Sequence, residues 1–253
     1  RIGIIGWKYF IPVESANPSQ TFEVPYYLVH ELVNLVDYEN LKNASDLMIH
    51  PDYGLRVALD IKELLFHEVA GTKASRKVLQ TIQNLQVGAS EIDASRFLSI
   101  DGDPLSVHPN INFGLENVLP GLKSPTYSKK LEVGEIITVG MGYRRALVAR
   151  TGLYARNKEE VPSAMKGIIE NFYAPYFQAL CNWYEALHIG ASGDQVFQAV
   201  KKSIGDFKEF GIGLNPGHLT HTEEWTNSIF FQGSTHRVKS GMALQCDIIA
   251  FPG

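Results

Sequence analysis

The sequence predicts an α+β fold built from two similar halves around a curved antiparallel sheet. Two stretches, residues 56–86 and 163–187, have the apolar spacing of long amphipathic helices, and the first could also be a broken pair of helices. They end in nearly identical turns, Val87-Gly88-Ala89-Ser90 and Ile189-Gly190-Ala191-Ser192, and a second helix and β-rich sequence follow each turn. A repeated order of this kind indicates duplication, and the seam between two such halves is a natural place for a pocket.

The first part of the chain predicts a small α/β portion before the repeat. Arg1-Ile2-Gly3-Ile4-Ile5-Gly6 has the composition of a buried strand that runs into a turn. Residues 24–36 have helical spacing, and residues 37–55 are rich in loop-forming residues. We therefore interpret residues 1–55 as the remnant and linker of an N-terminal α/β domain, and residues 56–253 as the main domain.

Within the main domain, we expect both halves to follow one plan. In the first half, residues 90–97 form the second helix and residues 96–154 contain the strands. In the second half, the corresponding stretches are residues 195–207 and 211–251. Two such halves that face each other would form one curved antiparallel sheet covered by helices.

The composition limits the possible functions. A chain of 253 residues with 45% hydrophobic and 20% charged residues is typical of a soluble globular protein. The net charge of −4 gives no basic surface for nucleic acid, and no apolar run approaches the ~18 residues of a membrane span. Both cysteines lie in apolar contexts, so we expect a cytoplasmic protein without a disulfide framework. The composition therefore predicts neither a nucleic-acid partner nor a membrane partner.

One segment in the last third of the chain has the composition of a hydrolytic site. It contains His218, His221, Glu223 and Glu224 just after a glycine-led turn. A neutral imidazole at His218 can act as a general base, with a carboxylate that fixes its tautomer. Alternatively, both histidines and one acid, Asp247 among them, have the ligand types of a single metal site. A polar surface loop is the simplest alternative.

Several short motifs, in this order, resemble one known family. They are Val87 to Glu91, His108-Pro109, Gly134 to Gly142, Arg150-Thr151, Gly217-His218, and Gly241-Met242 with the strand to Asp247. From about Arg56 onward the chain is similar to the pita-bread family, which includes methionine aminopeptidases, Xaa-Pro peptidases and creatinase. The resemblance implies the duplicated fold. It also implies that His108 faces the substrate and that His218 occupies the position of a metal-binding histidine.

Departures from the family pattern change the expected chemistry. The resemblance places two metal-binding aspartates of the family on Gly140 and Leu147, and a metal-binding glutamate at or next to Asp247. The last ligand of the family would follow Gly253. A two-metal centre needs bridging carboxylates, and neither glycine nor leucine supplies an oxygen ligand. We therefore predict that the chain has no two-metal centre and needs no cofactor.

The leading prediction is a metal-independent hydrolase of a small C–N bond, similar to creatinase. His218 and His108 are the candidate acid and base, and Glu223 or Glu224 is the candidate orienting carboxylate. The candidate substrate-binding residues are His221, Arg150, Trp225 and Asp247. Two alternatives stay open: a non-catalytic peptide- or protein-binding protein on a degenerate peptidase scaffold, and an Xaa-Pro aminopeptidase or dipeptidase with a rearranged metal site. The resemblance also implies a homodimer and a small-molecule or short-peptide ligand.

Overall fold

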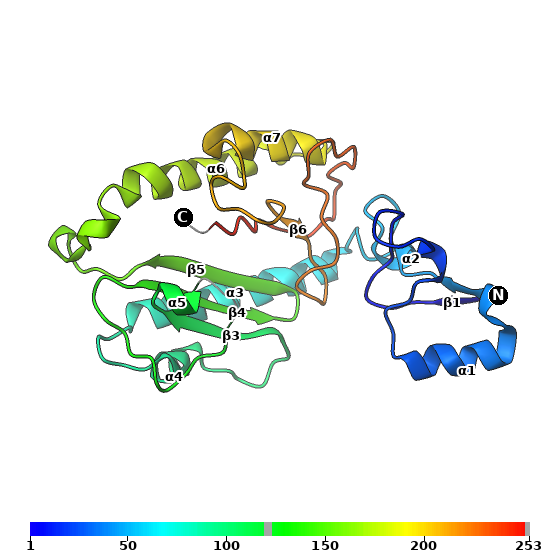
Figure 1. Cartoon of the computed structure of the whole chain (residues 1–253), viewed down its shortest axis with the longest axis horizontal. Coiled ribbons are helices and arrows are strands. Elements are labelled where there is room, and N and C mark those ends of the chain that lie inside the picture. The colour runs from blue at the N-terminus through cyan, green and yellow to red at the C-terminus, as the bar shows by residue number, and fades with distance from the viewer. Residues whose placement is uncertain (119–122, 251–253) are drawn as a thin grey trace.

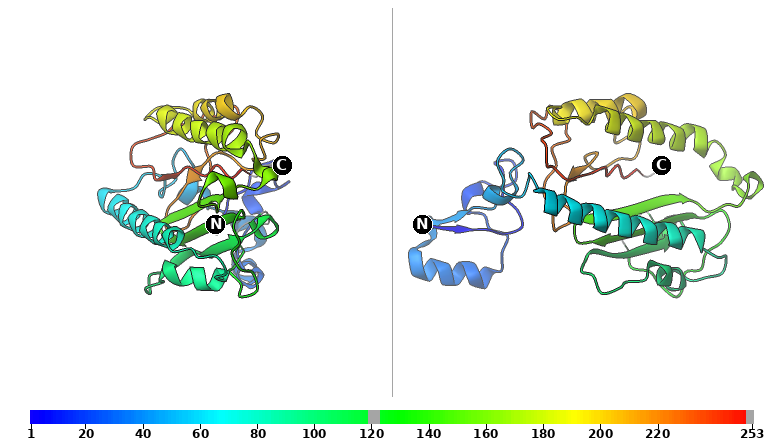
Figure 2. Two further views of the ribbon diagram at one scale, coloured as in Figure 1. Left: turned by 90° about the vertical axis from the view of Figure 1, so that its left-hand side faces the viewer. Right: turned by 180° about the vertical axis from the view of Figure 1, so that it is seen from behind.

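The computed structural model describes residues 1–118 and 123–250, and it has the α+β architecture that the sequence predicts (Figure 1). The first half, residues 56–154, lies below the second half, residues 163–250, and residues 1–55 form an N-terminal segment to one side. The views from the end and from behind show the same arrangement (Figure 2). Residues 251–253, which complete the predicted second strand region and the main domain, lie outside the described residues.

The N-terminal segment is a small β-α-β unit. Strands β1 (Ile2–Ile4) and β2 (Leu41–Asn43) pair in parallel, and helix α1 (Tyr26–Val36) lies between them in sequence. The short elements of this segment are η1 (Pro18–Gln20), η2 (Tyr38–Asn40) and α2 (Asp46–Ile49). Strand β2 lies in the stretch predicted as loop, because three residues are too few to show an apolar period. Helix α1 has no buried residue, and the predicted homodimer stays a prediction.

The first half is a three-stranded antiparallel sheet with a long helix packed against it. Helix α3 (Ile61–Gln83) is unbroken and begins at a capping box formed by Asp60 and Glu63. Strands β3 (Leu105–Phe113), β4 (Ile136–Tyr143) and β5 (Ala146–Leu153) follow in the order β3-β4-β5. The shorter helices are α4 (Glu91–Ser95), η3 (Arg96–Leu98) and α5 (Leu115–Val118). The core of this half lies between α3, α4 and the sheet.

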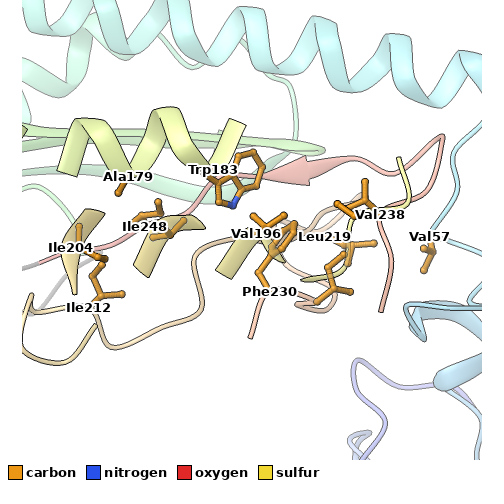
Figure 3. Close-up of a cluster of buried hydrophobic side chains, with 13 residues drawn as sticks. Val57, Ala179, Trp183, Val196, Ile204, Ile212, Leu219, Phe230, Val238 and Ile248 are labelled. Carbon is orange, nitrogen blue, oxygen red and sulfur yellow. The ribbon is translucent and has the colours of Figure 1, made fainter. Parts of the chain in front are cut away.

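The second half has its own core under two helices. Helices α6 (Ala174–Ala186) and α7 (Gly193–Ile204) cover the short strands β6 (His218–Leu219) and β7 (Leu244–Gln245). Trp183 and Phe230 are the largest side chains of this core (Figure 3). The predicted helix over residues 163–187 is regular only from residue 174. Before it come two 3-10 turns, η4 (Lys158–Glu160) and η5 (Ser163–Met165), and a π-helical turn, η6 (Ile169–Tyr173).

The two halves repeat the turn between their helices in hydrogen-bonding detail. Gly88 and Gly190 both adopt the left-handed region, with φ of 85° and 90°. Each of these glycines donates its N–H over 2.8 Å to a carbonyl in the segment that leads into β4 or β7. Ser90 and Ser192 then cap the following helices with capping boxes. The predicted duplication is therefore visible in the turns as well as in the order of elements.

The strands of the two halves differ in number and length. Among the residues that the structure describes, the first half has three strands of eight or nine residues, whereas the second half has one pair of two-residue strands. Within the described ranges the strands form separate sheets, so the curved sheet is interrupted at the seam. None of the helices in the described part of the chain is both long enough and apolar enough to cross a bilayer.

Candidate functional site

His218, at the start of β6, is almost completely buried, with 3% of its surface exposed. The residue before it, Gly217, has φ of 130°, and a Cβ there would lie 2.6 Å from the carbonyl oxygen of Gln245. Only glycine lets β6 approach β7 this closely. The Nδ1 atom of His218 lies 3.2 Å from the carbonyl oxygen of Leu219. Because a carbonyl only accepts, Nδ1 carries a proton and Nε2 is the atom left to react.

Two carboxylates face this Nε2 atom. Glu224 Oε1 lies 3.2 Å from it and Asp247 Oδ2 lies 3.5 Å from it. Neither contact has hydrogen-bond geometry, so the buried Nε2 has charged neighbours but no aligned acceptor among the described residues. We call His218, Glu224 and Asp247 the His218 cluster. Its three ligand atoms lie within 4.8 Å of one another.

The electrostatics of the His218 cluster favour a charged imidazole. Burial disfavours the imidazolium, but the carboxylates of Asp247 and Glu224 outweigh burial and raise the pKa of His218 to about 9. The imidazole is therefore protonated at neutral pH when no other cation lies between the carboxylates. Two uses of the cluster follow: the imidazolium of His218 can donate its proton, or a metal ion can bind at Nε2 and displace the proton into solvent.

The His218 cluster fits one divalent cation. One imidazole nitrogen and two carboxylate oxygens are typical ligands of Zn²⁺ and other catalytic metals. Two metals do not fit. Gly140 on β4 supplies no oxygen, and a Cβ there would lie 3.0 Å from that of Ala149 on β5, so the position has no space for a carboxylate. Leu147 on β5 supplies no oxygen either.

His221 belongs to a second group of charged side chains. Arg56 donates to His221 Nδ1 at 3.1 and 3.3 Å and also pairs with Glu223. The other ring nitrogen of His221 lies 3.6 Å from Glu63 Oε1. Burial first, and the charge of Arg56 second, lower the pKa of His221 to about 4. These four residues form what we call the Arg56 cluster, and Arg56 is a site residue that the sequence analysis missed.

A pocket of about 420 Å³ lies beside the His218 cluster. Its wall includes Trp7 of the N-terminal segment, Ser106 and Arg144 of the first half, and Glu224 and Trp225 of the second half. Glu224 belongs to both the pocket wall and the cluster, and the Trp225 ring centre lies 6.4 Å from that of His218. The pocket therefore borders the His218 cluster at Glu224, while His218 and Asp247 lie behind its wall. The sequence predicted Trp225 and Glu224 but gave no signal for the other three residues.

The remaining predicted residues lie outside the His218 cluster. His108 is exposed on β3, one residue beyond the pocket wall. Arg150 is exposed on β5 and donates over 2.6 Å to the carbonyl of Ala149. The structure thus brings Glu224, Trp225 and Asp247 to His218, while the roles predicted for His108 and Arg150 stay predictions.

No protein-family profile matches the sequence, and no curated protein matches it. Solved structures do match. The Xaa-Pro dipeptidase from Bacillus anthracis superposes with a TM-score of 0.73 and 19% identity, over 91% of this chain and 64% of that chain. Dipeptidase PepE from Mycobacterium ulcerans gives a TM-score of 0.72 and 19% identity, over 92% and 62%. The prolidase from Pyrococcus horikoshii OT3 gives 0.70 and 18%, over 88% and 63%.

This chain has the pita-bread fold. The prediction of the fold class is therefore confirmed, and the low identity agrees with a divergent sequence. The chain spans 62–64% of the length of these three structures. At such identities a shared pita-bread fold does not establish a shared activity, which must be argued from the site.

Proposed function

We propose that this chain is a hydrolase of the C–N bond in a short peptide or a similarly small amide, with the His218 cluster as its reaction centre. One observation carries the proposal: the buried Nε2 of His218 faces Glu224 and Asp247 without an aligned hydrogen-bond acceptor, beside a pocket. A buried polar atom of this kind is costly unless a proton, a metal or a substrate uses it. The shared fold with proteins described as Xaa-Pro dipeptidases and prolidases supports the same reaction class.

A single divalent cation is the reaction partner that these side chains fit best. His218, Glu224 and Asp247 would hold it, and a bound cation would polarise a substrate carbonyl and lower the pKa of a water molecule. Only three protein ligands are present in the cluster, so positions are left for substrate. This proposal corresponds to a peptidase with a rearranged metal site.

A metal-free reaction is the second candidate, and the raised pKa of His218 favours it. The imidazolium can donate its Nε2 proton to the nitrogen that leaves when the C–N bond breaks. Asp247 or Glu224 can accept the proton of the attacking water, so that the protons balance. The same pocket without turnover would be that of a binding protein, which is the third outcome of the test.

The test combines metal analysis with turnover. Protein purified without chelator is assayed with Xaa-Pro dipeptides, creatine-like compounds and cyclic amidines, before and after treatment with a chelator. About one equivalent of metal, with turnover that is lost on chelation and restored by Zn²⁺ or Mn²⁺, supports the cation. Turnover that survives chelation supports the metal-free reaction. Two tightly bound equivalents would contradict both candidates, and binding without turnover would identify a binding protein.

A further inference from the structure

We propose that Arg56 is a positioning residue of the reaction centre, because it holds residues 221–223 so that the next residue, Glu224, faces His218. This inference rests on the proposed function and concerns the cation that the His218 cluster would bind. Arg56 lies just before helix α3, far in sequence from the segment that it contacts. It would act on the cation through Glu224 and would not touch the cation itself.

The guanidinium of Arg56 contacts every residue of the 221–223 segment. Its Nε and Nη2 atoms lie 3.3 and 3.1 Å from His221 Nδ1. Nη2 also donates over 3.1 Å to the hydroxyl of Thr222 and pairs with the carboxylate of Glu223. The Arg56 side chain is only 22% exposed, so water partly loses access to these contacts. A planar guanidinium holds several acceptors in fixed directions, which the ammonium group of lysine does not.

Hydrogen bonds within the 221–223 segment make it a tight turn. The N–H of His221 and the hydroxyl of Thr220 both donate to the carbonyl of Glu223, over 3.1 and 3.0 Å. The hydroxyl of Thr222 donates over 2.7 Å to the carboxylate of Glu223. Side-chain bonds of this kind fix the local backbone. The contacts of Arg56 therefore set the direction in which the chain leaves the turn.

Glu224 leaves this turn on the side of His218. Its Oε1 atom lies 3.2 Å from His218 Nε2, and the amide of Gln245 on β7 donates to the same oxygen over 3.4 Å. Because Arg56 binds Glu223, the adjacent Glu224 is the carboxylate that turns to the imidazole. Groups that orient a metal ligand from outside the coordination sphere typically account for about 10–100-fold in metal affinity.

The charge of Arg56 and its contacts have opposite expected effects on a cation. A guanidinium near the His218 cluster repels a cation, so a pure charge effect would make binding tighter when a neutral residue replaces Arg56. Loss of position would make binding weaker, because Glu224 would no longer be held toward His218. The sign of the change therefore separates the two explanations.

Arg145 provides a matched control for the charge. Its charge also acts on His221, and its guanidinium lies 5.2 Å from the ring centre of Phe66. Within the described part of the chain, Arg145 makes no hydrogen bond or ion pair with residues 221–223. Replacement of Arg145 thus removes a nearby positive charge without removing a contact to the turn.

The test measures the binding of Zn²⁺ to the full chain by calorimetry, and the site is defined as the equivalent that His218→Ala removes. We expect Arg56→Gln to raise the dissociation constant by about 10–100-fold. Arg56→Lys keeps the charge but lacks the planar group, so it should also weaken binding. Arg145→Gln should bind at least as tightly as the wild type. In a Glu224→Gln background, Arg56→Gln should change the constant by less than about threefold, because both substitutions remove the same interaction.

Four results would overturn the inference. They are unchanged or tighter binding in Arg56→Gln, wild-type affinity in Arg56→Lys, the full loss in the Glu224→Gln background, and no Zn²⁺ equivalent that depends on His218. The last result would leave the metal-free reaction as the candidate function. Circular dichroism and thermal melting show whether the variants are folded, and Arg56→Lys carries the test if Arg56→Gln does not fold. Because Zn²⁺ is bound without substrate, a chain that shows the expected coupling but no turnover would refute only the proposed hydrolase.

Discussion

The two halves of the chain share a turn and differ in the residue that follows its serine cap. In the first half this residue is Glu91, which is fully buried and accepts hydrogen bonds from the N–H of Phe113 at 2.8 Å and from Thr126 at 2.9 Å. In the second half it is Gly193, where a Cβ would lie 1.7 Å from the carbonyl oxygen of Ile229. In the first half, a buried carboxylate therefore links the turn to its neighbouring strand by hydrogen bonds. In the second half, the backbone of the turn packs directly against the backbone of Ile229.

The two halves also differ in which candidate site residues they carry. Gly140 and Leu147, on β4 and β5, supply no ligand, and the first half contributes pocket wall through Ser106 and Arg144. The second half carries the whole His218 cluster, next to β6 and β7. The two halves thus keep the same turn, while the proposed reaction centre lies in the second half and the first half supplies part of the pocket wall.

The largest expected effect comes from comparing the two predicted catalytic histidines. We expect His218→Ala to lower hydrolysis by roughly 10²–10⁴-fold, because it removes either a proton donor or a metal ligand. His108→Ala should have a much smaller effect, since His108 is exposed on the first half and lies outside the cluster. Steady-state rates on the best substrate measure both. Equal losses would show that the two halves share the reaction.

The next effect is on stability at the repeated turn. We expect Gly193→Ala to destabilise the fold by about 3 kcal/mol, because the methyl group would overlap the carbonyl of Ile229 and force the backbone apart. Urea unfolding measures the change. Gly213→Ala is the matched control, since a Cβ there meets no atom within 4 Å. Similar losses for both variants would mean that the close contact is unimportant.

A smaller loss is expected from the corresponding position of the first half. Glu91→Gln should cost about 1–3 kcal/mol, because an amide cannot accept on both sides and leaves a donor of Phe113 or Thr126 unpaired in the interior. The exposed Glu116→Gln is the control. If the unfolding free energies of Glu91→Gln and Glu116→Gln agree within about 0.5 kcal/mol, the buried carboxylate does not stabilise the fold.

The smallest effect concerns the Arg56 cluster and pH. The pKa of His221 is about 4 in the folded chain against an ordinary 6.5, so the unfolded chain binds the proton more tightly. The resulting stability is fully present above pH 6.5 and is lost as the pH falls through about 4. His221→Gln should remove this loss of stability, which is of the order of 1 kcal/mol over that pH range. Urea unfolding of the wild type and the variant at several pH values between 4 and 6.5 measures this loss. The same dependence on pH in both proteins would show that His221 does not cause it.

The sequence by itself determined the duplicated frame and the centre of the site. A glycine in the left-handed region, a serine cap and a long apolar stripe act within a few residues, so Gly88, Gly190, Ser90 and Ser192 could be recognised locally. His218 could be found from its glycine-led turn. The resemblance assigned His218 and Asp247 to ligand positions of one site, and the pairing of β6 with β7 is what brings them together.

Tertiary structure alone decided how the site is completed. Trp7 meets Trp225, Arg56 meets His221, and Arg144 lines the same pocket, although no local pattern links these distant residues. The adjacent glutamates show the reason most clearly. Glu223 and Glu224 are chemically identical and equally placed in sequence, yet packing turns one toward Arg56 and the other toward His218. The partner of a side chain depends on which surfaces the fold brings together, and that is fixed only when the whole chain is packed.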